Sequence, residues 1–199
     1  MSQAAEANRP TALLVIDVQE GNVRPEGWPQ YWVANQDGLL ANVQSLIAKA
    51  RGAGSEVIYI QHAESDWPEM APGAPQFEVV PEIAPDPDDK RFTKWYSDSF
   101  VETGLGEYLE ERGHRHIVTA GVASNFCIDS TTRSAVFKGY NVTLATDAHS
   151  TSGNSALTAE QIIAGENAVL PNLAGPGGAT VSGKPTDEIE FAPAEGANA

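Results

Sequence analysis

Short apolar runs alternate with segments of helical periodicity along most of this chain. The runs cover residues 11–18, 56–60, 116–121, 141–146 and 179–182, and each is about as long as one strand. The first, TALLVIDV, is apolar almost throughout, which is typical of a parallel strand buried on both faces. Strands that alternate with helices predict an α/β domain. We therefore expect a three-layer α-β-α, Rossmann-like domain with helices flanking a mainly parallel sheet of about six strands.

Helical signals fill the intervals between these runs. We expect helices over residues 39–50, around 100–112, over 126–138 and from 158 to about 169. Val101 is expected on the apolar face of the second helix, and Thr158 with Gln161 makes a capping box at the start of the last one. Residues 61–93 are rich in proline and lack periodicity, so we interpret them as one long loop. Loops of that length in compact domains often carry function.

The organisation predicted from this pattern is a single domain with short polar ends. Residues 1–10 are expected to form a flexible N-terminus, residues 11–183 the folded domain, and residues 184–199 a C-terminal tail of low complexity. No internal repeat is apparent.

The charge and cysteine content exclude several classes of function. The chain carries 27 acidic and 12 basic residues, a formal net charge of −15, which disfavours binding to nucleic acid or to an anionic membrane. A single cysteine cannot form an internal disulfide bond. No signal peptide or apolar run of membrane-spanning length is visible. We therefore expect a soluble, cytoplasmic protein.

Three residues that could carry chemistry lie where ligands bind in parallel sheets, beyond the carboxyl ends of the strands. Asp17 ends the first apolar run, although loop amides could equally satisfy a carboxylate there. Cys127 lies near the start of a helix, whose N-terminus favours a thiolate of lowered pKa, although most isolated cysteines are buried and inert. Lys94 follows the long loop, where a solvated surface role is the commoner one.

The four histidines do not form a cluster along the chain. His62, just past the second run, could serve as a ligand or a base, but no second histidine or carboxylate lies at metal-binding spacing. We therefore expect His62 to line a polar pocket and predict no metal site. His114, His116 and His149 are expected to be structural.

Three motifs resemble the isochorismatase-like cysteine hydrolases, a superfamily that includes nicotinamidases, N-carbamoylsarcosine amidases and isochorismatases. They are ALLVIDVQEG, KWYSDSFVETGL and IVTAGVASNFCIDSTTRSAVFKGYNVTLATDAHS, and they occur in the family's order. The resemblance extends over about residues 11–170. Each motif is modestly specific, and the three together are strongly so.

The resemblance implies a catalytic triad of Asp17, Lys94 and Cys127. It also implies a cis peptide bond between Val122 and Ala123, and an oxyanion hole formed by the backbone N–H groups of Ala123 and Cys127. In this scheme Cys127 attacks an amide-type carbonyl, and Asp17 takes the thiol proton and later passes it to the leaving amine. Lys94 holds the carboxylate and stabilises the thiolate. No cofactor is implied.

The substrate pocket is predicted only loosely. Its candidate residues, taken from the expected loops and strand ends, are Gln19, Trp28, His62, Trp67, Trp95 and Asn125. Tryptophans that anchor loops or a subunit interface would occupy the same positions in the sequence. The loops at 21–38 and 61–93 are expected to determine specificity.

The expected function is hydrolysis of a C–N bond in a small-molecule amide, lactam or carbamoyl compound, through a thioester acyl-enzyme. Nicotinamidases bind a metal through a second histidine that is missing after His62, which disfavours nicotinamide. One alternative is an isochorismatase-type ether hydrolase, which does not need the cysteine. Another is a non-catalytic member that binds a small molecule or senses oxidation through its thiol. The resemblance further implies a homo-oligomer, a dimer or a tetramer.

Overall fold

Six parallel strands form one sheet at the centre of the fold. The computed structural model describes residues 10–24 and 33–193. The strand order is β3-β2-β1-β4-β5-β6, and every neighbouring pair is parallel. The strands are β1 (Thr11–Ile16), β2 (Glu56–His62), β3 (Lys90–Lys94), β4 (His116–Val122), β5 (Asn141–Ser150) and β6 (Val181–Lys184). The expected fold class, an α/β domain with a parallel sheet between helices, is confirmed.

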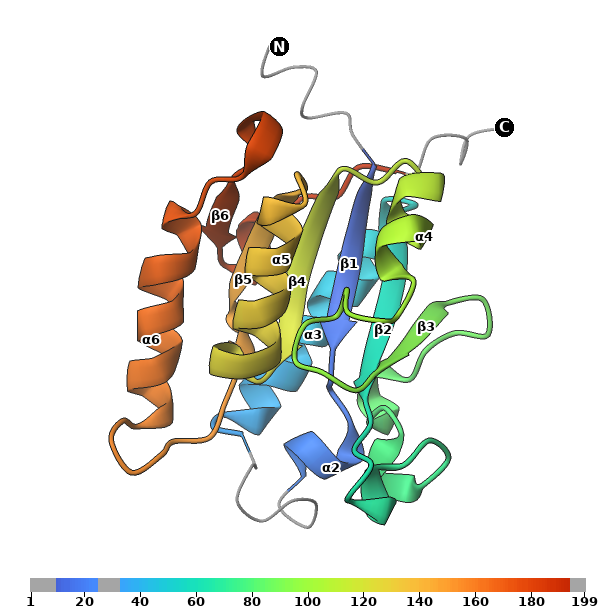
Figure 1. The fold of residues 1–199 in the computed structure, drawn as a ribbon, viewed down its shortest axis with the longest axis vertical. Helices are drawn as coiled ribbons and strands as arrows, with labels where there is room; N and C mark the ends of the chain where they lie inside the picture. Colours follow the sequence, from blue (N-terminus) through green and yellow to red (C-terminus); the bar gives the residue numbers. More distant parts are fainter. Residues whose placement is uncertain (1–9, 25–32, 194–199) are drawn as a thin grey trace.

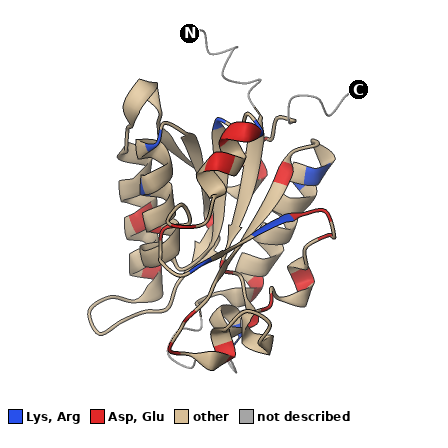
Figure 2. Ribbon diagram, turned by 45° about the vertical axis from the view of Figure 1, so that its right-hand side comes forward, with Lys and Arg blue, Asp and Glu red and all other residues tan. Residues whose placement is uncertain are grey.

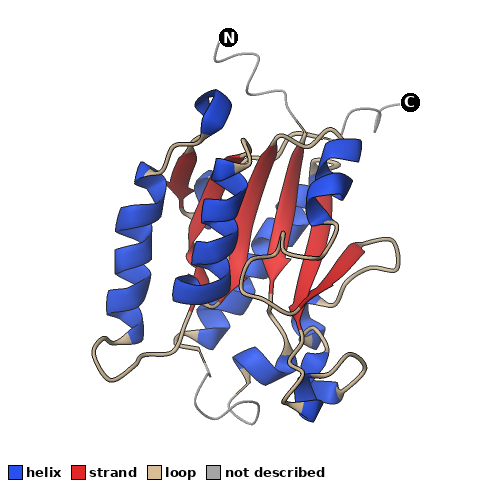
Figure 3. Ribbon diagram, in the orientation of Figure 1, coloured by secondary structure: helices blue, strands red, loops and turns tan. Residues whose placement is uncertain are grey.

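Helices cover both faces of this sheet (Figures 1 and 3). The helix α3 lies on one face, and α4, α5 and α6 lie on the other. A short helix, α2, follows β1 at the edge of the sheet where the strands end. The bounds are α2 (Glu20–Val23), α3 (Gln36–Gly52), α4 (Leu105–Glu111), α5 (Asp129–Phe137) and α6 (Ala159–Val169). No helix among the described residues is long and apolar enough to cross a membrane.

The central strand β1 is apolar without alternation because it is buried on both faces. All six of its residues are buried. Leu13 and Val15 belong to the core under α3, whereas Leu14 and Ile16 pack in the core under α4 and α5. A strand covered by helices on both sides needs apolar side chains at every position, because each face of the pleat is removed from water.

The helix α3 is formed by the residues that periodicity indicated. Its six buried residues are Leu39, Leu40, Val43, Leu46, Ile47 and Ala50. The chain leaves the helix at Gly54, whose φ of 72° is in the left-handed region that glycine adopts without strain. The capping box at the start of α6 is also present, with Thr158 accepting from the Gln161 backbone N–H.

Two expectations about helices and strands were wrong. The helix expected from residue 100 begins only at Leu105, because Gly104, with a φ of 78°, separates it from a series of turns in which Val101 is exposed. The strand β3 was missed inside the supposed 61–93 loop. It is an edge strand whose polar, exposed residues include Lys90 and Arg91, marked blue in Figure 2, so it lacks the apolar signal of a buried strand.

The C-terminal boundary also needs correction, because the predicted tail from residue 184 is largely part of the fold. Ile189 is buried in the core under α3. The Ser55 hydroxyl donates to the Ala192 carbonyl at 2.7 Å, and the Thr11 backbone N–H donates to the same carbonyl at 3.0 Å. The domain therefore extends at least to residue 192. Residues 1–9 and 194–199, which were expected to be flexible, lie outside the described residues.

Candidate active site

The side chains of Asp17, Lys94 and Cys127 meet at the carboxyl edge of the sheet. Lys94 Nζ lies 2.7 Å from Asp17 Oδ2 and donates to Cys127 Sγ at 3.0 Å. Lys94 is 0% exposed, Asp17 2% and Cys127 9%. The structure therefore brings together the three residues of the predicted triad, which come from three separate parts of the chain. The ammonium group contacts the other two residues of the triad directly.

Each of these residues is held by the backbone around a strand end. Asp17 follows β1 with a left-handed φ of 55°, and its N–H donates to the Ile60 carbonyl at 2.9 Å. Lys94 is the last residue of β3, where it lies opposite His62 in the parallel ladder. Cys127 belongs to a π-helical turn, Ser124–Ile128, between β4 and α5. The Val122–Ala123 peptide bond that precedes this turn is cis, at the position the resemblance implies.

The electrostatics of the thiol differ from the sequence expectation. Burial, together with the neighbouring Asp17 carboxylate, raises the pKa of Cys127 to about 12, although Lys94 acts in the opposite direction. The expected lowering of this pKa by a helix N-terminus was therefore wrong. The π-helical turn places the sulfur in a nearly dry site beside an anion, and both features disfavour the thiolate.

Lys94 remains a cation in this environment. Burial by itself lowers the pKa of Lys94, but its interactions with the Asp17 carboxylate and with the Cys127 sulfur outweigh that effect, and the net shift is upward. The resting site therefore consists of a protonated thiol beside an ion pair. A thiol in this state can act as a nucleophile only if a base takes its proton.

His62 and Glu64 extend this group of polar side chains toward the pocket. His62 Nδ1 lies 3.3 Å from Lys94 Nζ, and His62 Nε2 lies 2.8 Å from Glu64 Oε1. Asp17, His62 and Cys127 present possible metal-ligand atoms within 4.8 Å of one another. The Lys94 ammonium contacts all three side chains, and its charge opposes a metal cation at that place.

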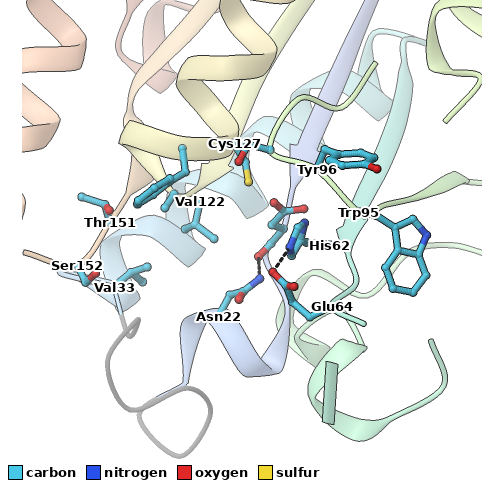
Figure 4. A pocket seen from close by; sticks show the side chains of 14 residues that line it. Asn22, Val33, His62, Glu64, Trp95, Tyr96, Val122, Cys127, Thr151 and Ser152 are labelled. Atoms are coloured by element: carbon cyan, nitrogen blue, oxygen red, sulfur yellow. Dashed lines mark hydrogen bonds and ion pairs between the residues drawn. The ribbon is translucent and has the colours of Figure 1, made fainter. Parts of the chain in front are cut away.

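A cavity of about 400 Å³ opens above the sulfur. Figure 4 shows the Cys127 sulfur facing this space, with Glu64 and Asn22 at its lower margin. The lining residues are Asp17, Asn22, Val33, His62, Glu64, Trp95, Tyr96, Ser97, Val122, Ala123, Phe126, Cys127, Thr151 and Ser152. Of the pocket residues predicted from the sequence, His62 and Trp95 are among them, and Trp28 lies outside the described residues.

Three predicted pocket residues do not line the cavity. Gln19 is fully buried, and its side chain binds backbone groups of His62 and Phe77, so it fastens the loop after β2 to β1. Asn125 accepts a hydrogen bond from the Thr151 hydroxyl at 2.7 Å, and it is Thr151 that reaches the pocket. Trp67 precedes a 3-10 turn in the loop after β2 and is not among the lining residues.

Some of the residues that sequence reasoning missed had a detectable signal. Glu64 follows His62 by two positions just beyond β2, and Thr151 directly follows β5, so inspection of every strand end would have included both. Asn22, Tyr96 and Phe126 had no such signal, because their positions depend on the turns that follow the strands. Asn22 donates its side-chain N–H to the Asp17 carbonyl at 3.1 Å.

A buried chain of hydrogen bonds supports the turn that carries Cys127. Ser124 Oγ lies 2.8 Å from His149 Nδ1, and His149 Nε2 lies 2.8 Å from Asn167 Oδ1. The Asn167 amide donates to the Thr146 carbonyl, so its oxygen faces the imidazole and accepts from Nε2–H. His149 Nδ1 is then the acceptor for the Ser124 hydroxyl. The chain links the start of the turn to α6.

Comparison with known proteins assigns this domain to a family. The family model of the isochorismatase domain matches residues 11–164. A solved cysteine hydrolase from Pseudomonas syringae pv. phaseolicola 1448A is 26% identical, with a TM-score of 0.77 over 89% of this chain and 89% of that one. A solved isochorismatase from Pseudomonas putida KT2440 is 26% identical, with a TM-score of 0.77 over 90% of this chain and 89% of that one.

A streptothricin hydrolase from Streptomyces noursei is 35% identical over 148 residues, which are 74% of this chain and 57% of the relative. A second streptothricin hydrolase from the same organism is 34% identical over 70% of this chain and 49% of its own length. The chain thus spans about half the length of the curated relatives it matches. The family match covers most of the domain, including Asp17, Lys94 and Cys127. The chain therefore belongs to the isochorismatase family.

Proposed function

We propose that this protein is a cysteine-dependent hydrolase of a small-molecule amide, lactam or carbamoyl C–N bond. The observation that carries the proposal is the position of Lys94 Nζ, in contact with both the Asp17 carboxylate and the Cys127 sulfur at the floor of a cavity. A nucleophile, a base and a fixed cation within contact of one another are the components that acyl transfer requires. The cavity volume suits a small-molecule substrate.

The first half of the reaction forms a thioester. Cys127 Sγ attacks the carbonyl carbon while Asp17 accepts the thiol proton, as the raised pKa of Cys127 requires. The negative charge that develops on the carbonyl oxygen is stabilised by the backbone N–H groups of Ala123 and Cys127, two residues that line the cavity. The C–N bond then breaks as Asp17 returns the proton to the leaving nitrogen, and ammonia or an amine departs.

The second half regenerates the thiol. A water molecule gives a proton to Asp17 and attacks the thioester carbon, the C–S bond breaks, and the proton passes to the sulfur. Throughout the cycle Lys94 keeps its charge, which the raised pKa of its ammonium group supports. That charge stabilises whichever neighbour is anionic, the Asp17 carboxylate at rest or the Cys127 thiolate as it leaves.

The comparisons support the reaction class, since the relatives carry the names streptothricin hydrolase, cysteine hydrolase and isochorismatase. The proposal predicts release of ammonia or amine from members of a panel of nicotinamide, carbamoyl, ureido, maleamate and lactam compounds. Mass spectrometry of the quenched enzyme is expected to detect an acyl group on Cys127.

The variant Cys127→Ala tests the thiol mechanism directly. It is expected to fold normally and to lose turnover by about a thousandfold or more. Glu111→Gln is the control, because this exposed residue ends α4 near the edge of the sheet opposite the pocket. Full activity in Cys127→Ala would overturn the thiol mechanism and favour ether hydrolysis.

A further inference from the structure

The charged side chains that line the cavity are both acidic. They are Asp17 and Glu64, and the remaining lining residues among those described are neutral or, in the case of His62, titratable. Lys94, the one cation among the described residues that contacts this group, is fully buried and already pairs with Asp17. Arg24, on the loop after α2, is occupied by Glu20 and Glu82. In the described part of the chain, the cavity therefore offers no free cation to a substrate carboxylate.

The charge of Glu64 is not cancelled by its neighbour. Lys94 Nζ carries only N–H donors and lies 3.3 Å from His62 Nδ1, which favours the tautomer with a bare Nδ1 and the imidazole proton on Nε2. A second proton on Nδ1 would face the Lys94 ammonium at 3.3 Å. In that tautomer His62 Nε2 donates to Glu64 Oε1, which lies 2.8 Å away. The other carboxylate oxygen of Glu64 has no partner among the described residues and is free to bind a ligand.

Three aromatic side chains also line the cavity. Trp95, Tyr96 and Phe126 all line it, and each is about half exposed, at 47%, 52% and 50%. Figure 4 shows Tyr96 and Trp95 on the same side of the pocket as His62. Aromatic faces attract ammonium and guanidinium groups through the ring quadrupole, and a carboxylate in the same cavity attracts the same groups.

We infer that the substrate carries a cationic group, an ammonium or a guanidinium, which binds Glu64 and the aromatic residues of the cavity while the scissile C–N bond faces Cys127. The inference rests on the proposed function and narrows its substrate class. It also predicts poor binding of substrates that carry a free carboxylate. The overall acidic excess, visible as red over the ribbon in Figure 2, attracts cations from a distance but does not distinguish one pocket residue from another.

The only cysteine in the chain provides a test that does not depend on turnover. The probes are two thiol reagents of similar size and opposite charge, (2-aminoethyl) methanethiosulfonate and (2-sulfonatoethyl) methanethiosulfonate. Labelling rates at Cys127 are normalised to the rates of a small free thiol. We expect the native protein to favour the cationic reagent, and Glu64→Gln to reduce that preference by about fivefold. Glu111→Gln removes the same charge far from the pocket and is expected to leave the preference unchanged.

Equal preferences in the native protein and in Glu64→Gln would overturn the inference. So would a failure of both reagents to label Cys127 in the folded protein when the unfolded chain is labelled, because a cation could not then reach the site. Raising the salt concentration from about 20 to about 500 mM is expected to weaken the contribution of distant charges more than that of Glu64.

Three matched amides separate this inference from the proposed function. They are 6-aminohexanamide, hexanamide and adipamate, which share a primary amide and differ in the charge of the far end. We expect kcat/KM for ammonia release to fall from 6-aminohexanamide to hexanamide to adipamate. In Glu64→Gln the difference in kcat/KM between these compounds is expected to be smaller. Turnover of adipamate at least as efficient as that of 6-aminohexanamide would overturn the inference and leave the hydrolase. Charge-selective labelling that depends on Glu64, without turnover of any amide in the wider panel, would support the inferred cation site and overturn the proposed amide hydrolase.

Discussion

Lys94 Nζ lies 2.7 Å from Asp17 Oδ2, and both side chains are almost completely buried. A buried ion pair contributes little net stability compared with apolar residues of the same volume, but the loss of one partner leaves an uncompensated charge in a dry environment. The pair is thus better explained by the chemistry of the site than by a need for stability, and this difference can be measured.

Lys94→Met is expected to lower the free energy of unfolding by about 3–5 kcal/mol, because it leaves the Asp17 carboxylate buried and unpaired. The double variant Asp17→Asn/Lys94→Met is also expected to lose unfolding free energy. Its loss is expected to be smaller, by about 2 kcal/mol, than the sum of the losses in the two single variants. Urea denaturation measures all three variants. The control is Arg51→Met, which breaks a more exposed pair with Asp89 and is expected to cost less than about 1 kcal/mol. Strictly additive losses would contradict the prediction.

Alkylation of Cys127 by iodoacetamide is expected to accelerate continuously as the pH rises from about 7 to about 10. The reactive form is the thiolate, and an ordinary cysteine with a pKa of about 8.5 approaches its maximum rate in that range. Burial and Asp17 raise the pKa of Cys127 to about 12, so no plateau is expected. Asp17→Asn removes one of the two causes and is expected to move the profile to lower pH. A plateau near neutral pH would show that the resting site holds a thiolate.

Stability is expected to fall on the acid side of neutrality because of His149. Burial lowers the pKa of His149 below its ordinary value, so the unfolded chain binds the proton more readily than the folded one. Its contribution is full above the unfolded pKa of about 6.5 and is lost as the pH falls below that value through the folded pKa. His149→Gln is expected to reduce the loss of unfolding free energy between about pH 7.5 and about pH 5.5.

The shifted pKa values of His116 and Glu166 also affect how stability changes with pH. Burial also lowers the pKa of His116, so His116→Gln is expected to reduce the acid-side loss as well. Burial and the negative charge of Asp129 raise the pKa of Glu166 to about 7, which opposes the loss. Because Glu166 is unchanged in both histidine variants, the differences from the native protein isolate each histidine. An unchanged pH dependence in His149→Gln would contradict the prediction.

Gly121→Ala is expected to destabilise the protein by about 3 kcal/mol or more. An added Cβ would lie 2.0 Å from the Ile16 carbonyl oxygen, and the φ of 127° is strained for any other residue. The strands β1 and β4 would have to separate at the position that precedes the turn carrying Cys127. Gly52→Ala, at the end of α3 where an added Cβ meets nothing within 4 Å, is expected to be neutral or to stabilise by up to about 1 kcal/mol. Thermal denaturation of both variants distinguishes backbone crowding from a general intolerance of alanine.

Much of the fold could be predicted because its buried strands have a simple signal. A central strand such as β1 is apolar at every position, and α3 repeats its apolar residues at helical spacing. The edge strand β3 has neither pattern, since only its Phe92 and Lys94 are partly or fully withdrawn from water. Its position beside β2 depends on backbone pairing, which local sequence does not encode.

The candidate site also has features that the sequence predicts and features that it does not. Asp17, Lys94 and Cys127 could be selected because the carboxyl ends of parallel strands converge and because their motifs match a family. The side of the chain on which the Gln19 side chain lies could not be predicted. The left-handed φ at Asp17 interrupts the alternation of side chains after β1. The raised pKa of Cys127 could not be predicted either, since it depends on burial and on a carboxylate that is remote in sequence.

The position of β1 between β2 and β4 has a consequence for how the protein is made. Ile16 pairs with Ile60 on one side and with Gly121, about a hundred residues later in the chain, on the other. During synthesis Asp17 leaves the ribosome long before Cys127, and it has neither its cation nor its thiol neighbour until β3 and β4 have joined the sheet. We therefore expect Asp17 and Cys127 to meet only late in folding, so that regain of thiol protection reports the joining of β3 and β4 to the sheet.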